Sequence, residues 1–295
     1  INGVEILRRM LTRKLFRIKA GAVIVMPLVN VFGFLINARG VPDGKDINRS
    51  FPGSRSGSLA KMLAYDLMTQ IVPFADIVVD LHTGGASKDN LPQIRTDLEY
   101  PGNRELALSF GLPAVIHFPT IARSFRREVQ QAGKRVVVYE VGESLRLDEA
   151  GIETGISGIL RMMRHFDMLA NKDSRSAGKT AKKGETVGLE PADLPLSEAA
   201  GEGSSETTGP DELAETVIYP ASRWIRARMS GVFQCQVALG EAVRERQVLG
   251  MLSDPFGREM KRVRAGVPGI VVGVNRNPVV SRGDALLHVA TLREV

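Results

Sequence analysis

The sequence predicts an α/β fold in which a mainly parallel sheet carries helices on both faces, followed by a small C-terminal all-β barrel or sandwich. Three observations support this prediction. Continuous apolar runs, typical of strands buried on both faces, alternate with segments of helical periodicity over residues 1–170. Residues 171–216 lack periodicity and are rich in Gly, Ser, Thr, Glu and Lys, which is typical of a flexible linker or insertion. Residues 217–295 contain short Val- and Ile-rich segments separated by turn residues, as small all-β domains do.

The first elements are a helix, a strand and a long loop. Residues 1–19 show the apolar spacing of an amphipathic helix with a basic outer face. The run AVIVMPLVNVFGFL, residues 22–35, is rich in Val, Ile and Phe and predicts a buried parallel strand with its exit. Residues 37–53 follow as a loop, because their glycines and prolines disfavour regular structure. The chain opens on Ile1 rather than methionine, already inside a helical pattern, so we expect a segment to be missing ahead of it.

The later elements of the first half alternate regularly. A helix over LAKMLAYDLMTQIV begins after Ser58, which is suited to cap it, and a buried strand then ends in His82. The remaining elements are a helix over residues 103–110, a strand over 113–118, a strand over 135–143 and a helix over 149–169.

Polar side chains follow two of these strands at the point where each apolar run ends. His82 ends the run IVVDL, and Glu140 ends the run RVVVY. Ligands bind at the carboxyl edge of open α/β sheets, so both residues are candidate site residues. A neutral imidazole can bind a metal ion and a carboxylate can shuttle protons, although a histidine here can also simply cap a turn. One histidine cannot hold a catalytic zinc ion, which usually takes three protein ligands.

Composition narrows the function classes. Hydrophobic residues make up 43% of the chain and charged residues 24%, and no apolar run approaches the roughly 20 residues that span a bilayer. The single cysteine, Cys235, excludes an internal disulfide framework and favours a cytoplasmic setting. The formal net charge is +6, but the basic residues are dispersed and only 5% of residues are aromatic. We therefore expect neither a nucleic acid nor a membrane as partner.

Several motifs together resemble a known family. NVFGFL, then Arg39, PDGKDINRSFPG, DLHTGG and YEVGE are similar in order and spacing to the succinylglutamate desuccinylase/aspartoacylase family of zinc amidohydrolases, relatives of the metallocarboxypeptidases. The resemblance covers about residues 1–170 and implies a zinc carboxypeptidase-like fold. It also implies cleavage of the amide bond of an N-acyl amino acid, or a related small N-acyl compound, by a metal-activated water. In that family a His-Gly-Asp-Glu motif supplies two further zinc ligands just before a stretch that looks like INGVEILRRM, with which this chain begins.

The resemblance also implies roles for individual residues. His82 would be the third zinc ligand, and Glu140 would be the general base that activates the water and then protonates the leaving amine. Asn48 and Arg49 would bind the substrate carboxylate and polarise the scissile carbonyl. Two further arginines, Arg39 and Arg126, match family arginines at positions where loop lengths vary, and Arg126 could equally be a surface residue.

The domains are then predicted as a zinc-hydrolase domain over residues 1–170, a linker over 171–216 and a β-barrel domain over 217–295. The last resembles the β-domain of bacterial members, which looks like a biotinyl or lipoyl carrier fold, but neither flank of Lys261 matches a carrier motif. We expect it to pack beside the active-site mouth or to build a homo-oligomer. Because two zinc ligands are absent, the alternative is a catalytically silent fragment that serves as a binding or scaffolding module.

Overall fold

The protein is known from a computed structural model, which describes residues 1–169 and 216–293. The predicted linker over 171–216 therefore lies outside the described residues, apart from residue 216. The α-helices are α1 (Asn2–Thr12), α2 (Val31–Leu35), α3 (Leu59–Asp66), α4 (Asn103–Ser109), α5 (Phe125–Gln131) and α6 (Glu149–His165). The strands of the first half are β1 (Ile77–Gly84), β2 (Lys88–Thr96), β3 (Ala114–His117) and β4 (Arg135–Glu143). Those of the second half are β5 (Val217–Tyr219), β6 (Ala221–Arg226), β7 (Gly231–Cys235), β8 (Ala242–Val243), β9 (Val248–Ser253), β10 (Met260–Arg264), β11 (Gly269–Asn275), β12 (Val279–Val280) and β13 (Ala285–Thr291).

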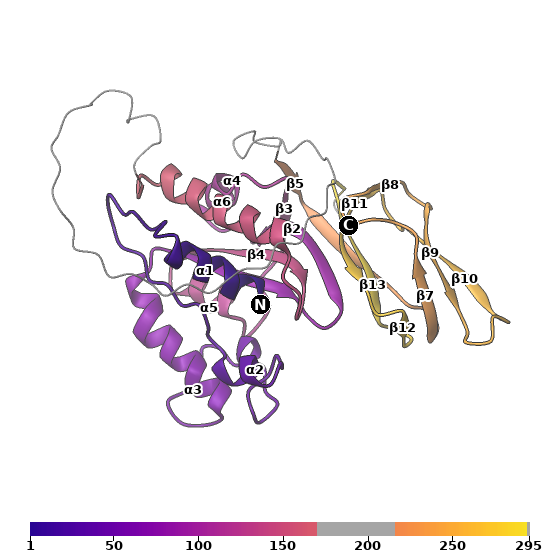
Figure 1. The fold of residues 1–295 in the computed structure, drawn as a ribbon, viewed down its shortest axis with the longest axis horizontal. Coiled ribbons are helices and arrows are strands. Elements are labelled where there is room, and N and C mark those ends of the chain that lie inside the picture. Colours follow the sequence, from indigo (N-terminus) through magenta and orange to yellow (C-terminus); the bar gives the residue numbers. More distant parts are fainter. Residues whose placement is uncertain (170–215, 294–295) are drawn as a thin grey trace, which may run out of the picture.

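The strands of the first half form one end of a nine-stranded mixed sheet, whose main path runs β1-β4-β2-β11-β13-β6 (Figure 1). Strands β1 and β4, β2 and β3, and β3 and β5 pair in parallel, whereas β2 runs antiparallel to both β4 and β11. The α/β class is confirmed. The sheet is mixed rather than mainly parallel because β2, which the sequence did not predict, runs antiparallel to β4, and β11, β13 and β6 alternate in direction beyond it.

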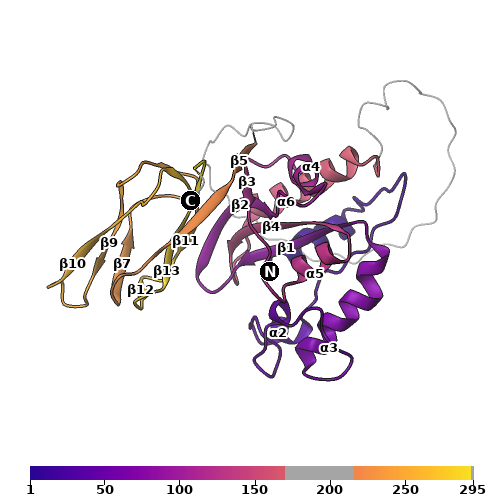
Figure 2. The same ribbon diagram turned by 180° about the vertical axis from the view of Figure 1, so that it is seen from behind.

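Helices cover both faces of this sheet (Figures 1 and 2). On one face α1, α4 and α6 pack over a core that includes Tyr139 of β4 and Phe110, both fully buried. On the other face α5 packs over Val136 of β4. Because side chains alternate along a strand, the face of β4 that carries Val136 also carries Glu140.

The predicted strand within residues 22–35 is wrong. The region is irregular up to Asn30, and its end folds into the short helix α2, which the Asn30 side chain caps by accepting a hydrogen bond from Gly33 N at 2.9 Å. In the described structure β1 ends the sheet path and pairs with β4 alone, and residues 22–30 do not pair with its free edge. Ile24 is accordingly 51% exposed.

The other predicted elements agree with the structure at their cores. The Ser58 side chain caps α3 as expected, and α4, β3, β4 and α6 lie within or close to their predicted ranges. The first helix is shorter than predicted because it ends at Thr12, after which Lys14 adopts a left-handed backbone with φ of 52°.

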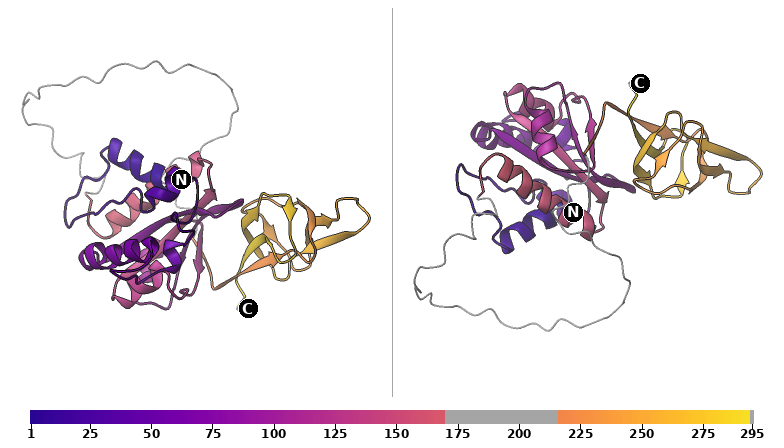
Figure 3. Two further views of the ribbon diagram at one scale, coloured as in Figure 1. Left: turned by 90° about the horizontal axis from the view of Figure 1, so that it is seen from below. Right: turned by 90° about the horizontal axis from the view of Figure 1, so that it is seen from above.

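The second half of the chain is built of strands, as predicted, and lies to one side of the helices (Figure 3). Strands β11, β13 and β6 continue the large sheet, and a second sheet has the order β10-β9-β7-β12. Apolar residues from both sheets form one core, among them Phe233, Leu252, Val271 and Leu287. None of the helices in residues 1–169 and 216–293 has both the length and the apolar character needed to cross a membrane.

Candidate active site

His82 and Glu140 lie next to each other on neighbouring strands. β1 and β4 pair in parallel with His82 opposite Glu140, so both side chains project from the same row of the sheet. The register that unites them is set by the apolar pairs below, such as Val79 opposite Val137. The structure thus brings together the two predicted residues that carry the most chemistry.

The His82 imidazole is held by a carboxylate on its own strand. Nε2 of His82 lies 2.8 Å from Oδ2 of Asp80, two residues earlier on the same face. Burial lowers the pKa of His82, but the adjacent Asp80 carboxylate outweighs this effect and raises the pKa to about 9. A carboxylate on one ring nitrogen fixes the orientation of the ring and leaves the other nitrogen, Nδ1, to face a ligand.

The Glu140 carboxylate accepts a hydrogen bond on each of its oxygens. Asn90 Nδ2 donates to Oε2 at 2.9 Å, and Arg95 Nη1 donates to Oε1 at 3.2 Å. The side chains of Glu140 and Arg95 are each only 12% exposed. Glu140 is therefore a fixed, partly desolvated carboxylate beside the imidazole, as a general base needs to be.

Two of the predicted arginines place positive charge close to this pair. Arg126 is 7% exposed and donates from Nη2 to the Pro119 carbonyl at 2.8 Å, while its buried Nη1 has no hydrogen-bond partner among the described residues. Burial lowers the pKa of Arg126 to about 10, and the charge of nearby Arg95 acts in the same direction. Arg39 is more exposed and is held by Asp46, whose Oδ2 accepts from Nε at 2.8 Å. Burial acts to raise the pKa of Asp80, but His82 and then the charges of Arg126 and Arg39 outweigh it and lower that pKa.

Asn48 and Arg49 lie on the 3₁₀ turn Ile47–Arg49 and are less closely tied to the centre. Asn48 Oδ1 accepts from Phe125 N at 2.8 Å, which joins this loop to the first residue of α5 and so to the neighbouring Arg126. The exposed Arg49 turns back, with Nη1 donating to the Asn48 carbonyl at 2.5 Å. In the described structure no hydrogen bond or ion pair joins Arg49 to His82 or Glu140.

The described residues do not complete a zinc site. Nowhere in residues 1–169 and 216–293 does a group of three His, Cys, Asp or Glu side chains lie suitably placed to hold a metal ion. A catalytic zinc ion usually takes three protein ligands. These residues therefore fit such a site only as the source of one imidazole, His82, with Asp80 behind it.

Three polar residues of β2 were missed by sequence reasoning because the strand itself was missed. Asn90, Gln93 and Arg95 all face the Glu140 side of the sheet, and Gln93 is opposite Glu140 in the β2/β4 ladder. Lys88, Asp89 and Pro92 obscure the pattern, but Pro92 is tolerated because it falls at the register shift between Asn90 and Gln93. The available signal was the alternation of Gln93, Ile94 and Arg95.

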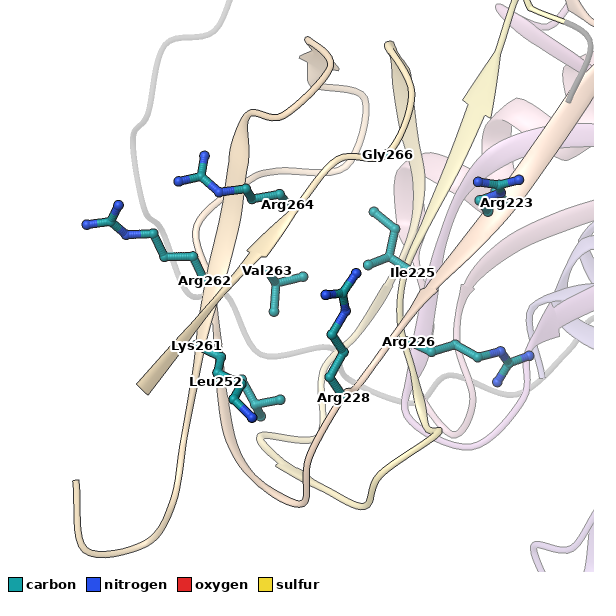
Figure 4. A pocket seen from close by; sticks show the side chains of 10 residues that line it. All are labelled: Arg223, Ile225, Arg226, Arg228, Leu252, Lys261, Arg262, Val263, Arg264 and Gly266. Carbon is teal, nitrogen blue, oxygen red and sulfur yellow. The ribbon is translucent and has the colours of Figure 1, made fainter. Parts of the chain in front are cut away.

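A separate cavity of about 270 Å³ lies in the second half of the chain, between β6 and β10 (Figure 4). It is lined by several cations, but Figure 4 shows Arg262 and Arg264 pointing to one side and Arg226 to the other. The guanidinium groups of two of them are also engaged elsewhere, because Arg226 donates to the Gly283 carbonyl and Arg264 to the Arg246 carbonyl. None of the predicted site residues lines this cavity.

Known proteins with similar sequences belong to a family of amide-bond hydrolases. The family model of the succinylglutamate desuccinylase/aspartoacylase catalytic domain matches residues 1–166. The N-alpha-acetyl-L-2,4-diaminobutyric acid deacetylase of Halomonas elongata is 26% identical over an alignment 311 residues long, gaps included, which covers 99% of this chain and 79% of that protein.

Solved structures have the same fold. A succinylglutamate desuccinylase/aspartoacylase from Rhodobacter sphaeroides aligns with a TM-score of 0.78 and 26% identity, covering 100% of this chain and 82% of that one. The product-bound ectoine utilization protein EutE from Ruegeria pomeroyi aligns with a TM-score of 0.76 and 20% identity, covering 98% of this chain and 81% of that one.

Proposed function

Because the chain belongs to the succinylglutamate desuccinylase/aspartoacylase family of amidohydrolases, we propose that it is a zinc-dependent deacylase acting on a small N-acyl amino acid or a related N-acyl compound. The observation that carries this proposal is the pairing of His82 with Glu140 in one row of the sheet. The Halomonas elongata relative, named as a deacetylase of N-acetylated diaminobutyric acid, supports a substrate of this size and chemistry.

Glu140 is the general base in this proposal. Its carboxylate takes a proton from the attacking water and delivers it to the nitrogen of the leaving amine. Arg126 offers its unpartnered Nη1, and Arg39 its partly exposed guanidinium, to the carboxylate of the substrate. Asn48 and Arg49 are assigned to the substrate carboxylate and the scissile carbonyl, for which Arg49 must turn inward from its contact with the Asn48 carbonyl.

We assign His82 as one zinc ligand, with further ligands from outside the described residues. A bound zinc ion supplies Lewis-acid activation of the attacking water. Zinc that is bound by this protein and lost in His82→Ala supports the assignment, whereas equal zinc contents contradict it.

The three-part division into a hydrolase domain, a linker and a β-barrel domain is part of the proposal, as are a cytoplasmic location and a homo-oligomeric assembly. The free thiol of Cys235 is compatible with a reducing compartment. Strands β11, β13 and β6 of the second half belong to the sheet that carries Glu140, and Figure 3 shows the second half beside the helices of the first, which supports packing of this half near the site.

The decisive experiment is Glu140→Gln, assayed for hydrolysis of N-acetylated diaminobutyrate, N-acylated aspartate and N-succinylated glutamate. We expect kcat to fall by about 10²- to 10⁴-fold, the usual contribution of a general base. Glu143→Gln is the matched control, because Glu143 is on the same strand but pairs with the exposed Arg146. Undiminished hydrolysis by Glu140→Gln would refute the proposed function.

A further inference from the structure

Glu140 is supported by a hydrogen-bonded chain that begins in the second half of the protein. The carbonyl of Val272 on β11 accepts from Gln93 Nε2 at 2.9 Å. Gln93 Oε1 accepts from Arg95 Nε at 3.3 Å, and Arg95 Nη1 donates to Glu140 Oε1 at 3.2 Å. The first and last steps cross between neighbouring strands, the middle step lies within β2, and the last step ends on the predicted base.

Burial keeps this series of hydrogen bonds in one arrangement. Gln93 is fully buried, and its Nε2 also donates to the Leu91 carbonyl at 3.1 Å, so its amide oxygen is left facing Arg95. Because the amide group has two distinct ends, the contacts of Nε2 determine where Oε1 points. The Arg95 guanidinium also lies over the ring of Phe118, with Cζ 5.8 Å from the ring centroid.

A second donor reaches Glu140 from the same strand. Asn90 Nδ2 holds Oε2 at 2.9 Å, so each carboxylate oxygen has its own partner. Asn90 is 4% exposed and is opposite Gly273 of β11, where a Cβ atom would come within 3.0 Å of Asn90 Oδ1. β11 therefore contacts both Gln93, which holds Arg95, and Asn90.

We propose that Asn90 and Arg95 are positioning residues that fix the Glu140 carboxylate for proton transfer, and that Gln93 anchors Arg95 to β11. The last torsion of a glutamate side chain is broad and soft, so an unsupported carboxylate samples many orientations. Two donors on two oxygens select one orientation, which a base must keep in order to meet the attacking water. This inference rests on the proposed function of Glu140 and gives the second half of the chain a part in the reaction.

The kinetic test compares Arg95→Met and Asn90→Ala with the unaltered protein on the substrate that it hydrolyses best. We expect kcat to fall by about 10²-fold in Arg95→Met and by about tenfold in Asn90→Ala, with KM changed by less than about twofold. Arg95→Lys keeps the charge and one donor, so it should recover part of the lost kcat. Gln93→Leu combined with Arg95→Met should be no worse than Arg95→Met alone, because the two residues act in series.

The control is Arg276→Met. Arg276 follows β11 and binds Asp89 at the start of β2, with Nη2 2.8 Å from Oδ2, but it does not contact Glu140. This variant removes an arginine–carboxylate pair that joins the end of β11 to β2, away from Glu140. Its kcat should therefore stay within about twofold of the unaltered protein. If Arg95→Met and Asn90→Ala fold and keep kcat within about threefold, the positioning role is wrong. Equal losses in Arg276→Met would likewise show a general effect of weakening β2 and would overturn the proposal.

A measurement without catalysis guards against variants that fail to fold. In the unaltered protein, the ¹⁵N-bound side-chain protons of Asn90 should be protected from exchange with solvent, and Glu140→Ala should accelerate their exchange by about tenfold or more. Unchanged exchange would overturn the contact on which the inference depends. If Glu140→Gln abolishes hydrolysis while Arg95→Met and Asn90→Ala do not reduce it, only the positioning role fails. If Glu140→Gln leaves hydrolysis intact, the proposed function itself fails.

Discussion

Acid should destabilise the folded protein through one buried histidine, His288 of β13. Its side chain is stacked on Trp224 of β6, with ring centroids 4.4 Å apart and an interplanar angle of 6°. The residue is 1% exposed, and its Nδ1 has no hydrogen-bond partner among the described residues. Burial, and to a lesser extent the positive charge of Arg95, lower the pKa of His288 to about 3.

The sign and size of the effect follow from linkage. Above pH 6.5, the ordinary pKa of histidine, the imidazole is neutral in both the folded and the unfolded chain, so it contributes no pH dependence. Between pH 6.5 and about 3 only the unfolded chain takes up this proton, so the free energy of unfolding falls as the pH is lowered. The loss approaches about 1.4 kcal/mol per pH unit in the middle of this window and amounts to about 2 kcal/mol between pH 7 and pH 5.

Urea titrations at pH 7, 6 and 5, followed by the emission of Trp224, measure this loss. Trp224 is the only tryptophan of the chain, so its emission reports on the β region around His288. His288→Phe keeps a neutral aromatic ring against Trp224, and any packing cost that it carries is the same at each pH. The unaltered protein should lose about 2 kcal/mol more than His288→Phe between pH 7 and pH 5. Parallel pH profiles for the two proteins would refute the reasoning.

Two further predictions concern stability. Gly158→Ala in α6 should lower the free energy of unfolding by about 1–3 kcal/mol in urea titrations, although alanine favours helices, because the new Cβ would lie 2.3 Å from Cδ1 of the fully buried Phe110. A stabilised variant would contradict this prediction. Asn48→Ala should cost about 1–2 kcal/mol because Phe125 N loses its acceptor at the start of α5, whereas Asn48→Asp, which keeps an acceptor, should cost less. Equal losses in the two variants would show that this hydrogen bond does not matter.

Periodicity predicted those elements whose apolar residues are buried against their neighbours. β4 and α6 were predicted well because most residues of β4 are buried and α6 has a clear inward face. The run over residues 22–35 has an equally apolar composition, but composition alone does not provide a neighbouring strand. Asn30, which caps α2, was the local signal against a continuous strand.

The candidate site was predictable where it depends on strand ends. His82 and Glu140 both follow apolar runs, and parallel pairing brings such ends together without further information. The supporting residues were not predictable, because β2 is polar, contains Pro92 and runs antiparallel to β4. Its contribution becomes visible only when the register places Gln93 opposite Glu140.

The β2/β11 pairing also bears on the role of the second half of the chain. Carrier domains that swing between sites need a loose attachment, yet here Asn90 lies opposite Gly273 in a continuous sheet, and the buried Gln93 donates to a carbonyl of β11. Releasing β11 would remove one of the two carbonyl acceptors of the fully buried Gln93 amide and would expose the edge of β2 that carries Asn90. Movement of the second half away from the sheet would therefore disturb the strand that holds Glu140. The structure thus favours a fixed support for the proposed base over a mobile carrier.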